Sequence, residues 1–505
     1  MTDEEDILAL QAAMNAGRLT ARQLTERYLA RIDQIDRRGP CLNAVIEINP
    51  DARAIADALD AERQARGPRG PLHGIPILIK DNIDTGDRMQ TTAGSLALVG
   101  ASAPRDAFIV ARLRAAGAVI LGKTNLSEWA NFRSDHSTSG WSSRGGLTRN
   151  PYALDRTPCG SSSGSGVAVA ANLCVAAIGT ETDGSITCPA SVNGVVGIKP
   201  TVGLASRSGI VPIAHSQDTA GPMARNVTDA AILLGALAGA NKEDPATAES
   251  STQAYSDYTQ FLDIDGLRGA RLGVLRSACA RHPHALAILE TAIAALRRLG
   301  AEIVDPIEIP ALTQIEHPEF VVLLYEFKAD LNAYLAARGD TVAVHSLAEV
   351  IAFNERERAR VMPYFGQEIM ERAQAMGSLD SPEYLAARAQ CLRLARAEGI
   401  DAVLRAHCLD AIIAITRSPA WPLDLVNGDP STGCGCSSPA AVAGYPHITV
   451  PAGFVFGLPV GLSFFGGAWQ EPTLIRLAYA FEQGTRARRP PRFLPTVDLT
   501  KGLAP

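Results

Sequence analysis

The chain has 505 residues, of which 47% are hydrophobic and 20% charged, and its formal net charge is −6. A chain of this size can bury a large core, and its negative charge argues against nucleic acid as a main partner. No stretch reaches the roughly 18 uninterrupted apolar residues of a membrane span, so we expect no membrane partner.

The N-terminal residues Met-Thr-Asp-Glu-Glu-Asp are acidic and lack the basic and then apolar pattern of a signal peptide. We therefore expect a cytoplasmic protein. The alternative is an exported protein, if Met1 stands in place of a removed signal peptide.

The nine cysteines are odd in number and scattered along the chain, which is not the pattern of a disulfide framework or a zinc site. The closest pair, Cys434 and Cys436, is spaced too tightly for a zinc knuckle. His282 and His284 lie in a polar segment with no third ligand nearby. We therefore expect no metal and no cofactor.

The first predicted element is a helix over residues 20–36. Thr20 and Gln23 match a capping box, in which each side chain bonds the backbone N–H of the other residue. The apolar residues that follow recur at helical spacing. This helix belongs to a helical N-terminal segment that we expect over residues 1–65.

Strand and helix patterns alternate after this segment. The run 77–79 is apolar and of strand character, residues 106–116 predict a helix, and residues 118–121 predict a buried strand. Such alternation is typical of an α/β fold with a covered sheet. We predict one domain over residues 1–505, built on a single large twisted mixed β-sheet covered by helices on both faces.

Residues 140–222 are dense in glycine and serine, poor in charge, and contain short apolar runs. Because a flexible linker would leave those runs exposed, we interpret the segment as part of a tightly turned catalytic core over residues 66–230. Residues 310–405 predict a helix-rich region on the substrate side. Strand character then returns within a C-terminal part, residues 406–490, which we expect to rejoin the sheet.

The run Gly160–Gly164 matches G-x-S-x-G, the nucleophile elbow of α/β-hydrolases, with Ser162 as the attacking residue. An elbow directly follows an apolar strand, but the preceding residues here are Arg-Thr-Pro-Cys. A phosphate-binding loop is also disfavoured, because no Gly-Lys-Ser or Gly-Lys-Thr follows. We expect Ser162 and Ser163 to be supporting hydrogen-bonding residues.

A second serine, Ser185, ends a turn of small residues that follows the apolar run 175–178. Such a turn presents a hydroxyl beside several free backbone N–H groups, which is what an oxyanion hole needs.

That serine also requires a base, and no histidine has a comparable context. Lys80 ends an apolar strand, where burial could lower its pKa by the roughly three units needed to act near neutral pH. Asp81 would oppose that shift if it faced the amine, but strand neighbours face opposite sides.

Several stretches together resemble the amidase signature family, and the resemblance covers essentially the whole chain. They are GIPILIKDN (74–82), GKTNLSEWA (122–130), RNPYALDRTPCGSSSGSGVAVA (149–170), IGTETDGSITCPASVNGVVGIKPTVG (178–203), QDTAGPMAR (217–225), AAVAGYPHITVPAG (440–453) and GLPVGLSFFG (457–466). The resemblance implies an amidohydrolase that works without a cofactor or an obligate protein partner.

The resemblance also implies a Ser-Ser-Lys catalytic triad. Lys80 falls on the base, Ser161 on a bridging serine held by a cis peptide bond, and Ser185 on the nucleophile, which forms an acyl-enzyme. The implied oxyanion donors are the backbone N–H groups of Thr182, Asp183, Gly184 and Ser185.

Departures from the family pattern bear on the substrate. Thr187 stands where many members carry an arginine that binds a substrate carboxylate, which argues against monoamides of dicarboxylic acids. Cys159 and Asp183 stand where the family usually has the first glycine of a Gly-Gly pair. The segments around Trp129, Ser185 and Tyr325 resemble bacterial peptide amidases, which deamidate the C-terminal carboxamide of peptides.

We therefore expect a small-molecule or peptide amide as substrate, with Trp129, Asn131 and Tyr325 as candidate residues of its pocket. Three alternatives remain. The first is an aryl acylamidase or carbamate (urethane) hydrolase with the same triad, and the second is the amidase component of a glutamine-dependent amidotransferase. The third is a catalytically inactive binding protein, which the filled triad positions disfavour.

Overall fold

The computed structural model describes residues 4–100, 102–310, 312–499 and 503–504. Within these ranges twelve strands form one sheet. They are β1 (Val45–Ile48), β2 (Pro76–Lys80), β3 (Val119–Thr124), β6 (Ala176–Glu181), β7 (Val196–Lys199), β8 (Thr219–Ala224), β9 (Arg271–Val274), β10 (Glu302–Val304), β11 (Ala411–Ile415), β12 (His447–Val455), β13 (Leu458–Phe465) and β14 (Leu503–Ala504). A separate hairpin pairs β4 (Trp141–Ser142) with β5 (Gly146–Leu147).

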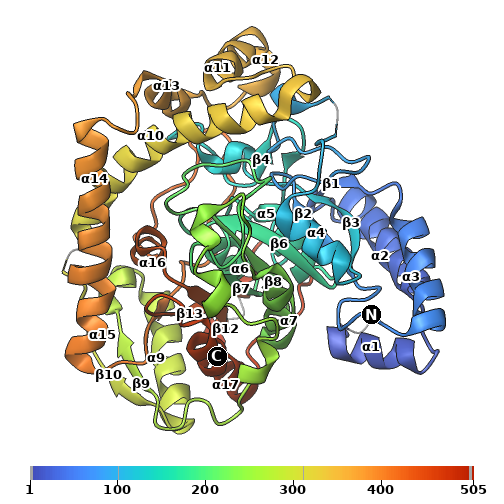
Figure 1. The fold of residues 1–505 in the computed structure, drawn as a ribbon. Helices are drawn as coiled ribbons and strands as arrows, with labels where there is room; N and C mark the ends of the chain where they lie inside the picture. The colour runs from blue at the N-terminus through green and yellow to red at the C-terminus, as the bar shows by residue number, and fades with distance from the viewer. Residues whose placement is uncertain (1–3, 101, 311, 500–502, 505) are drawn as a thin grey trace.

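The strand order is β1-β3-β2-β6-β8-β7-β12-β13-β11-β9-β10, with β14 paired to β12. β2 is parallel to both β3 and β6, and β9 is parallel to both β10 and β11. The other neighbouring strands of the sheet are antiparallel. The prediction of one large mixed sheet is therefore confirmed (Figure 1).

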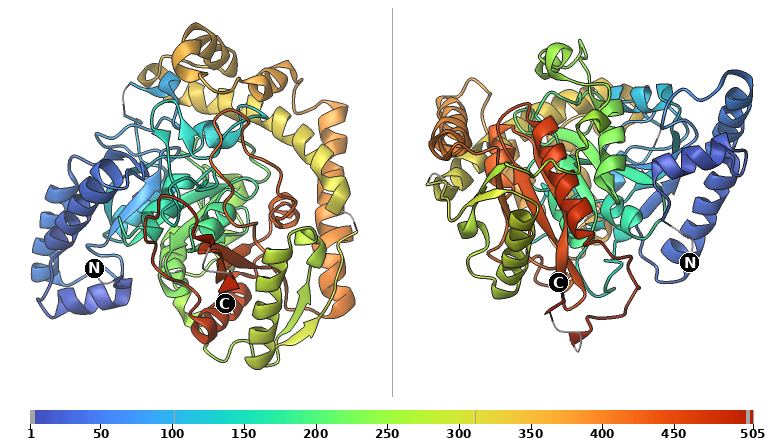
Figure 2. Two further views of the ribbon diagram at one scale, coloured as in Figure 1. Left: turned by 180° about the vertical axis from the view of Figure 1, so that it is seen from behind. Right: turned by 90° about the horizontal axis from the view of Figure 1, so that it is seen from below.

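Helices pack around this sheet. They are α1 (Ile7–Asn15), α2 (Ala21–Arg31), α3 (Ala52–Arg66), α4 (Phe108–Ala115), α5 (Ser163–Ala170), α6 (Thr187–Val192), α7 (Val227–Leu237), α8 (Ser250–Gln253), α9 (Pro283–Arg298), α10 (Leu312–Arg338), α11 (Leu347–Arg356), α12 (Arg358–Val361), α13 (Glu368–Ala375), α14 (Pro382–Leu392), α15 (Asp401–His407), α16 (Ser438–Ala443) and α17 (Glu471–Thr485). Helices α1, α2 and α3 lie on one side of the molecule and α14 on the opposite side (Figures 1 and 2). None of the helices in the described ranges is long and apolar enough to cross a membrane.

The helix predicted over residues 20–36 begins as expected and changes geometry before it ends. Thr20 and Gln23 form the reciprocal capping box. After α2 the chain continues as a π-helical segment, Ile32–Arg38, which ends before Gly39. The apolar spacing predicted the helix, whereas the change from α to π geometry left no signal in it.

Helix α5 is buried along its whole length. It packs against β2 and β6. A Cβ at Gly164 would overlap the carbonyl oxygen of Ala44, so glycine is required for this close approach. The glycine-rich and serine-rich segment is therefore a folded core element, as its apolar runs predicted.

Helix α10 dominates the predicted helix-rich region and packs against α13, α14 and α16. Its buried Glu326 accepts hydrogen bonds from the Ser216 N–H at 2.9 Å and from the Tyr384 hydroxyl at 2.7 Å. Glu326 thus ties α10 both to the segment before β8 and to α14.

Four cysteines form two disulfides, which corrects the expectation of no disulfide framework. Cys159 pairs with Cys188 across 29 residues, and Cys279 pairs with Cys434 across 155 residues. In each pair the partners meet only in the folded chain. Sequence spacing alone therefore could not predict the pairing.

Candidate active site

The three predicted catalytic side chains come from neighbouring elements. Lys80 ends β2, Ser161 precedes α5, and Ser185 follows β6. Because β2 and β6 are parallel neighbours, their carboxyl ends meet at one edge of the sheet, where α/β folds commonly place a site. Ser161 and Ser185 line one cavity of about 460 Å³ there, a size typical of ligand pockets.

Lys80 has no exposed surface. Its Nζ donates to Ser161 Oγ at 2.7 Å and to Thr180 Oγ1 at 2.8 Å. Burial lowers the pKa of Lys80 to about 7, although the carboxylates of Asp218 and Glu181 oppose the shift. A substantial fraction of the amine is therefore neutral at neutral pH and can accept a proton.

Asp81 faces away from the Lys80 amine, as the alternation of strand side chains predicted. Its carboxylate accepts hydrogen bonds from Thr92 Oγ1 and from the Gly94 N–H, and it forms an ion pair with Arg144. Other groups thus balance the charge of Asp81, and the pKa of Lys80 stays low although the two residues are neighbours in the chain.

Four successive backbone N–H groups are available in the turn before α6. Within the described ranges, the N–H groups of residues 182–185 donate no hydrogen bond. Gly184 has φ of +79°, a conformation that favours glycine. The turn therefore presents free donors beside the Ser185 hydroxyl, which is the arrangement that a developing oxyanion requires.

The buried side chain of Glu181 fixes the backbone that directly follows this turn. Its Oε2 accepts hydrogen bonds from the N–H groups of Ile186 at 2.7 Å and Thr187 at 2.9 Å, at the start of α6. Burial raises the pKa of Glu181, and the nearby Lys199 ammonium opposes this rise. Sequence reasoning missed the role of Glu181, although the residue lies within a motif that carried the family resemblance.

The Gly160–Ser161 peptide bond is cis, as the resemblance implied for the bridging serine. The Ser161 carbonyl oxygen accepts a hydrogen bond from the Ser127 N–H at 3.1 Å. A Cβ at Gly160 would overlap Ser127 Oγ, so the backbone needs glycine to pass this close.

Ser162, the serine of the apparent nucleophile elbow, is fully buried and does not line the cavity. Its Oγ donates to the Thr180 carbonyl oxygen at 3.0 Å and accepts from the Thr180 N–H at 3.2 Å. Ser163 Oγ donates to the Cys159 carbonyl oxygen at 2.6 Å. Both hydroxyls support the backbone of the site.

Of the three predicted pocket residues, the structure places only Asn131 on the cavity wall. Trp129 is 2% exposed and packs in an apolar cluster. The Tyr325 hydroxyl donates to Glu383 Oε2 at 2.6 Å, and its ring packs beside Tyr384. Trp129 and Tyr325 therefore do not line this cavity, and their side chains pack in apolar clusters that include residues of the helix-rich region.

The far wall of the cavity contains residues that sequence reasoning did not single out. Helix α10 contributes Leu323, and the segment after β11 contributes Arg417, Trp421 and Asp429. These residues lie well over a hundred positions after Ser161 and Ser185, and those after β11 belong to none of the motifs that carried the family resemblance. Only the tertiary fold brings them to the site.

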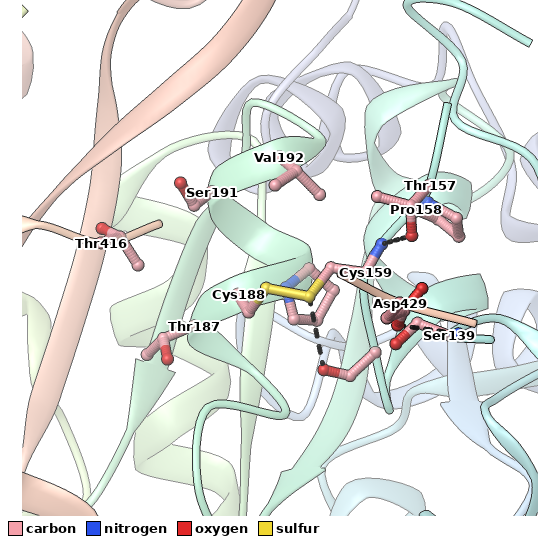
Figure 3. The surroundings of a disulfide bond; sticks show 12 residues. Ser139, Thr157, Pro158, Cys159, Thr187, Cys188, Ser191, Val192, Thr416 and Asp429 are labelled. Carbon is pink, nitrogen blue, oxygen red and sulfur yellow. Dashed lines mark hydrogen bonds between the residues drawn. A yellow bond between two sulfur atoms is a disulfide. The ribbon is translucent and has the colours of Figure 1, made fainter. Parts of the chain in front are cut away.

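The Cys159–Cys188 disulfide, drawn in Figure 3, joins two residues that line the cavity. Cys159 lies two residues before Ser161, and Cys188 lies three residues after Ser185. The bond therefore joins the segment that carries Ser161 to the helix that follows Ser185.

Among the described residues, one group has metal-ligand atoms close to one another, namely His215, Glu326 and Asp330. His215 Nδ1 lies 2.9 Å from Asp330 Oδ2, and the His215 N–H donates to the same oxygen. Asp330 raises the pKa of His215 through this hydrogen bond. The group is a hydrogen-bonded pair with a buried carboxylate beside it, and we assign no metal to it.

Residues 23–475 match the amidase family. A probable amidase of Arabidopsis thaliana is 44% identical over 501 residues, which cover 97% of this chain and 92% of that protein. One component of the glutamyl-tRNA(Gln) amidotransferase of Symbiobacterium thermophilum is 37% identical, covering 93% of this chain and 95% of that protein.

Two solved structures are also similar to this chain over nearly its whole length. The native peptide amidase of Stenotrophomonas maltophilia is 55% identical with a TM-score of 0.93, covering 97% of this chain and 99% of that chain. A peptide amidase in complex with the competitive inhibitor chymostatin is also 55% identical, with a TM-score of 0.94 and the same coverage. These likenesses extend over the sheet, the cavity and the helix-rich region.

Proposed function

This chain belongs to the amidase family and is an amidase that hydrolyses amide C–N bonds, and we propose that it releases ammonia from the C-terminal carboxamide of peptides. Ser185 is the nucleophile of this proposal, Ser161 the bridging serine and Lys80 the base. The observation that carries the chemistry is the hydrogen bond of 2.7 Å from the buried Lys80 Nζ to Ser161 Oγ.

The reaction begins with substrate bound against the turn before α6. Neutral Lys80 takes the proton of Ser161, which takes the proton of Ser185 as Ser185 Oγ attacks the carboxamide carbon. The carbonyl oxygen becomes negatively charged and accepts hydrogen bonds from the N–H groups of Thr182, Asp183, Gly184 and Ser185.

The tetrahedral intermediate collapses when the C–N bond breaks. The relay returns one proton to the departing nitrogen, so that ammonia leaves and an ester joins the acyl group to Ser185. A water molecule then gives a proton to the same relay and attacks the ester carbonyl. Cleavage of the ester bond restores the Ser185 hydroxyl and frees the peptide acid.

Two observations support a peptide amide as the substrate. The likeness to the Stenotrophomonas maltophilia peptide amidase spans 97% of this chain at 55% identity. In addition, Thr187 lines the cavity at the position where many relatives would carry a carboxylate-binding arginine, so a second carboxylate lacks that partner.

The likeness to the glutamyl-tRNA(Gln) amidotransferase component supports a second candidate, release of ammonia from glutamine for use by a partner protein. That function differs in its substrate and shares the proposed chemistry. Aryl acylamides and carbamates likewise require the same catalytic residues. The candidates are therefore separated by substrate and not by mutation of the triad.

The test is a mass-spectrometric time course on an N-acetylated dipeptide amide, with free glutamine, an anilide and an aryl carbamate in parallel. We expect the dipeptide amide to show the mass change of –NH₂ replaced by –OH, with its internal bond intact. Hydrolysis confined to the anilide or the carbamate would reject the peptide amide and retain the triad. Hydrolysis confined to glutamine would favour the amidotransferase function.

The two disulfides indicate in which cellular compartment the protein works. Disulfides persist in oxidising compartments and are rare in the cytosol. The pairs Cys159–Cys188 and Cys279–Cys434 therefore support an exported enzyme over a cytoplasmic one. Alkylation of the native protein without reductant, followed by peptide mass mapping, tests this: labelling of all four cysteines would reject it.

A further inference from the structure

Arg417 lies in the wall of the active-site cavity and has no polar partner. It follows β11 and lines the same cavity as Ser161 and Ser185. Within the described part of the chain, no group accepts a hydrogen bond from its guanidinium, and its fully covered Nε is left without a partner. A guanidinium carries five N–H donors and stays charged, so this half-buried group has unused binding capacity.

The guanidinium is nevertheless held in place. It stacks over the Trp421 ring, with 5.4 Å between the guanidinium carbon and the ring centroid. A Cβ at Gly435 would lie 2.8 Å from an Arg417 terminal nitrogen, so glycine leaves room for the guanidinium. Gly435 lies beside Cys434, whose disulfide to Cys279 anchors that segment. The donors are therefore preorganised before substrate binds.

The carboxylates near Arg417 accept hydrogen bonds from other groups, although Asp183 Oδ1 is left without a partner among the described residues. Asp429 accepts hydrogen bonds from the Trp421 indole at 3.0 Å and from the Ser139 N–H at 3.0 Å. Asp183 Oδ2 accepts a hydrogen bond from Ser438 Oγ at 2.6 Å. Burial lowers the pKa of Arg417, whereas the charges of these two carboxylates oppose that shift.

The net charge of the cavity wall indicates which kind of hydrogen-bond acceptor of the substrate Arg417 can bind. The charged residues among those lining the cavity are Arg417, Asp183 and Asp429, which sum to a net negative wall. A substrate anion would meet this excess charge, whereas a carbonyl oxygen accepts hydrogen bonds without adding charge. A peptide amide carries such an oxygen one residue before the scissile carboxamide.

We propose that the Arg417 guanidinium binds the backbone carbonyl oxygen that precedes the C-terminal residue of a peptide amide. This inference rests on the proposed function and deepens it, because it names the part of the substrate that distinguishes a peptide amide from a simple amide. Arg417 is then a specificity-determining residue on the acyl side of the scissile bond, and Lys80, Ser161 and Ser185 act without it.

The test compares two amides that differ in this group. N-acetylphenylalaninamide has the preceding carbonyl, and phenylpropionamide lacks the acetylamino group altogether. We expect the wild-type enzyme to prefer the first in kcat/KM, and Arg417→Met to lower that preference about 10- to 100-fold, as for loss of a hydrogen bond to a charged group. Hydrolysis of phenylpropionamide should stay within about 2-fold, because the triad keeps its geometry.

Controls separate this role from a packing role. Methionine keeps much of the side-chain volume over Trp421, and Arg356→Met removes a similarly stacked arginine on the outside of α11. Arg356→Met should leave the substrate preference unchanged. An equal fall in kcat/KM for both substrates in Arg417→Met would assign Arg417 to packing and overturn the proposal.

A second pair of substrates tests whether Arg417 binds a substrate carboxylate instead of a carbonyl oxygen. If the wild-type enzyme prefers N-acetylglutamic acid α-amide to its γ-methyl ester, and Arg417→Met abolishes that preference, the guanidinium binds a carboxylate and the proposal is wrong. Failure of the proposed function looks different, because the wild-type enzyme would then release no ammonia from any of these amides.

Discussion

Lys80 Nζ donates a hydrogen bond to Ser161 Oγ across 2.7 Å, and neither residue has exposed surface. The nearest charged carboxylate in the sequence, Asp81, is bound by Arg144 and two further donors. The amine therefore donates to hydroxyl and carbonyl oxygens, and the carboxylates of Asp218 and Glu181 raise its pKa less than burial lowers it. This environment makes the lysine titrate where it can act as a base.

The activity of the wild-type enzyme should rise with pH through about 7, where Lys80 loses its proton. Only the neutral amine can accept the Ser161 proton, so kcat/KM should follow the neutral fraction and then level off. A pH profile of ammonia release from a dipeptide amide measures this limb. Full activity well below pH 7 would remove Lys80 from the role of base.

The same shift predicts how stability depends on pH. The folded pKa of Lys80 is about 7, and an unfolded lysine has a pKa of about 10.4. Between these values the unfolded chain binds more protons, so the free energy of unfolding contributed by Lys80 rises with pH. Denaturant titrations of the wild type and Lys80→Met should therefore show the wild type gaining relative stability across this window.

Ser185→Ala should reduce turnover to the background rate with the fold intact, because it removes the proposed nucleophile. Ser162→Ala should retain most of the activity and lose about 1–3 kcal/mol of stability through the buried Thr180 groups that it leaves unpaired. Rate assays and thermal melts distinguish the two. An inactive Ser162→Ala beside an active Ser185→Ala would restore the nucleophile-elbow interpretation.

Glu181→Ala should lower kcat about 100-fold with little change in KM, because the oxyanion turn loses the carboxylate that fixes it. Glu181→Gln is the matched control, since its amide oxygen can still accept from the Ile186 and Thr187 N–H groups. We expect the glutamine variant to recover much of the rate. Equal damage by both substitutions would show that the negative charge itself is required.

Replacing both Cys159 and Cys188 by serine should lower the free energy of unfolding by about 3–4 kcal/mol, from the entropy of the loop that the bond closes. Cys41→Ser, which changes an exposed free cysteine, is the control and should be neutral. Denaturant unfolding without reductant measures both. An unchanged midpoint in the double variant would mean that the two thiols are not bonded in solution.

Local patterns predicted several elements of the fold, two of which lie at the candidate site. The strand ending at Lys80, the helix after Thr20 and the strand before Ser185 all have short-range signals in spacing, capping or small-residue turns. The fold class followed from the alternation of such elements. The assignment of Ser161 required the family resemblance, since serines 161, 162 and 163 are locally indistinguishable.

The residues that surround the substrate had no comparable signal. Arg417 and Asp429 reach the cavity through the pairing of β11 with β13 and β9, which no local pattern encodes. Trp129 and Tyr325 illustrate the opposite case, because large aromatic residues near a site are as often core as pocket. The disulfide partners, 29 and 155 residues apart, likewise depend on tertiary structure alone.

The cavity is lined mainly by two parts of the chain that lie far apart in the sequence. Residues 130–188 supply Ser161, Ser185 and the turn with the free N–H groups, and Leu323 with residues 416–437 supplies most of the opposite wall. The two parts are joined by hydrogen bonds, from the Ser139 N–H to Asp429 and from the Thr157 N–H to the Trp421 carbonyl oxygen. A substitution of a wall side chain can therefore change the preferred substrate, whereas one that moves the backbone near Trp421 also moves the segment that leads to Ser161.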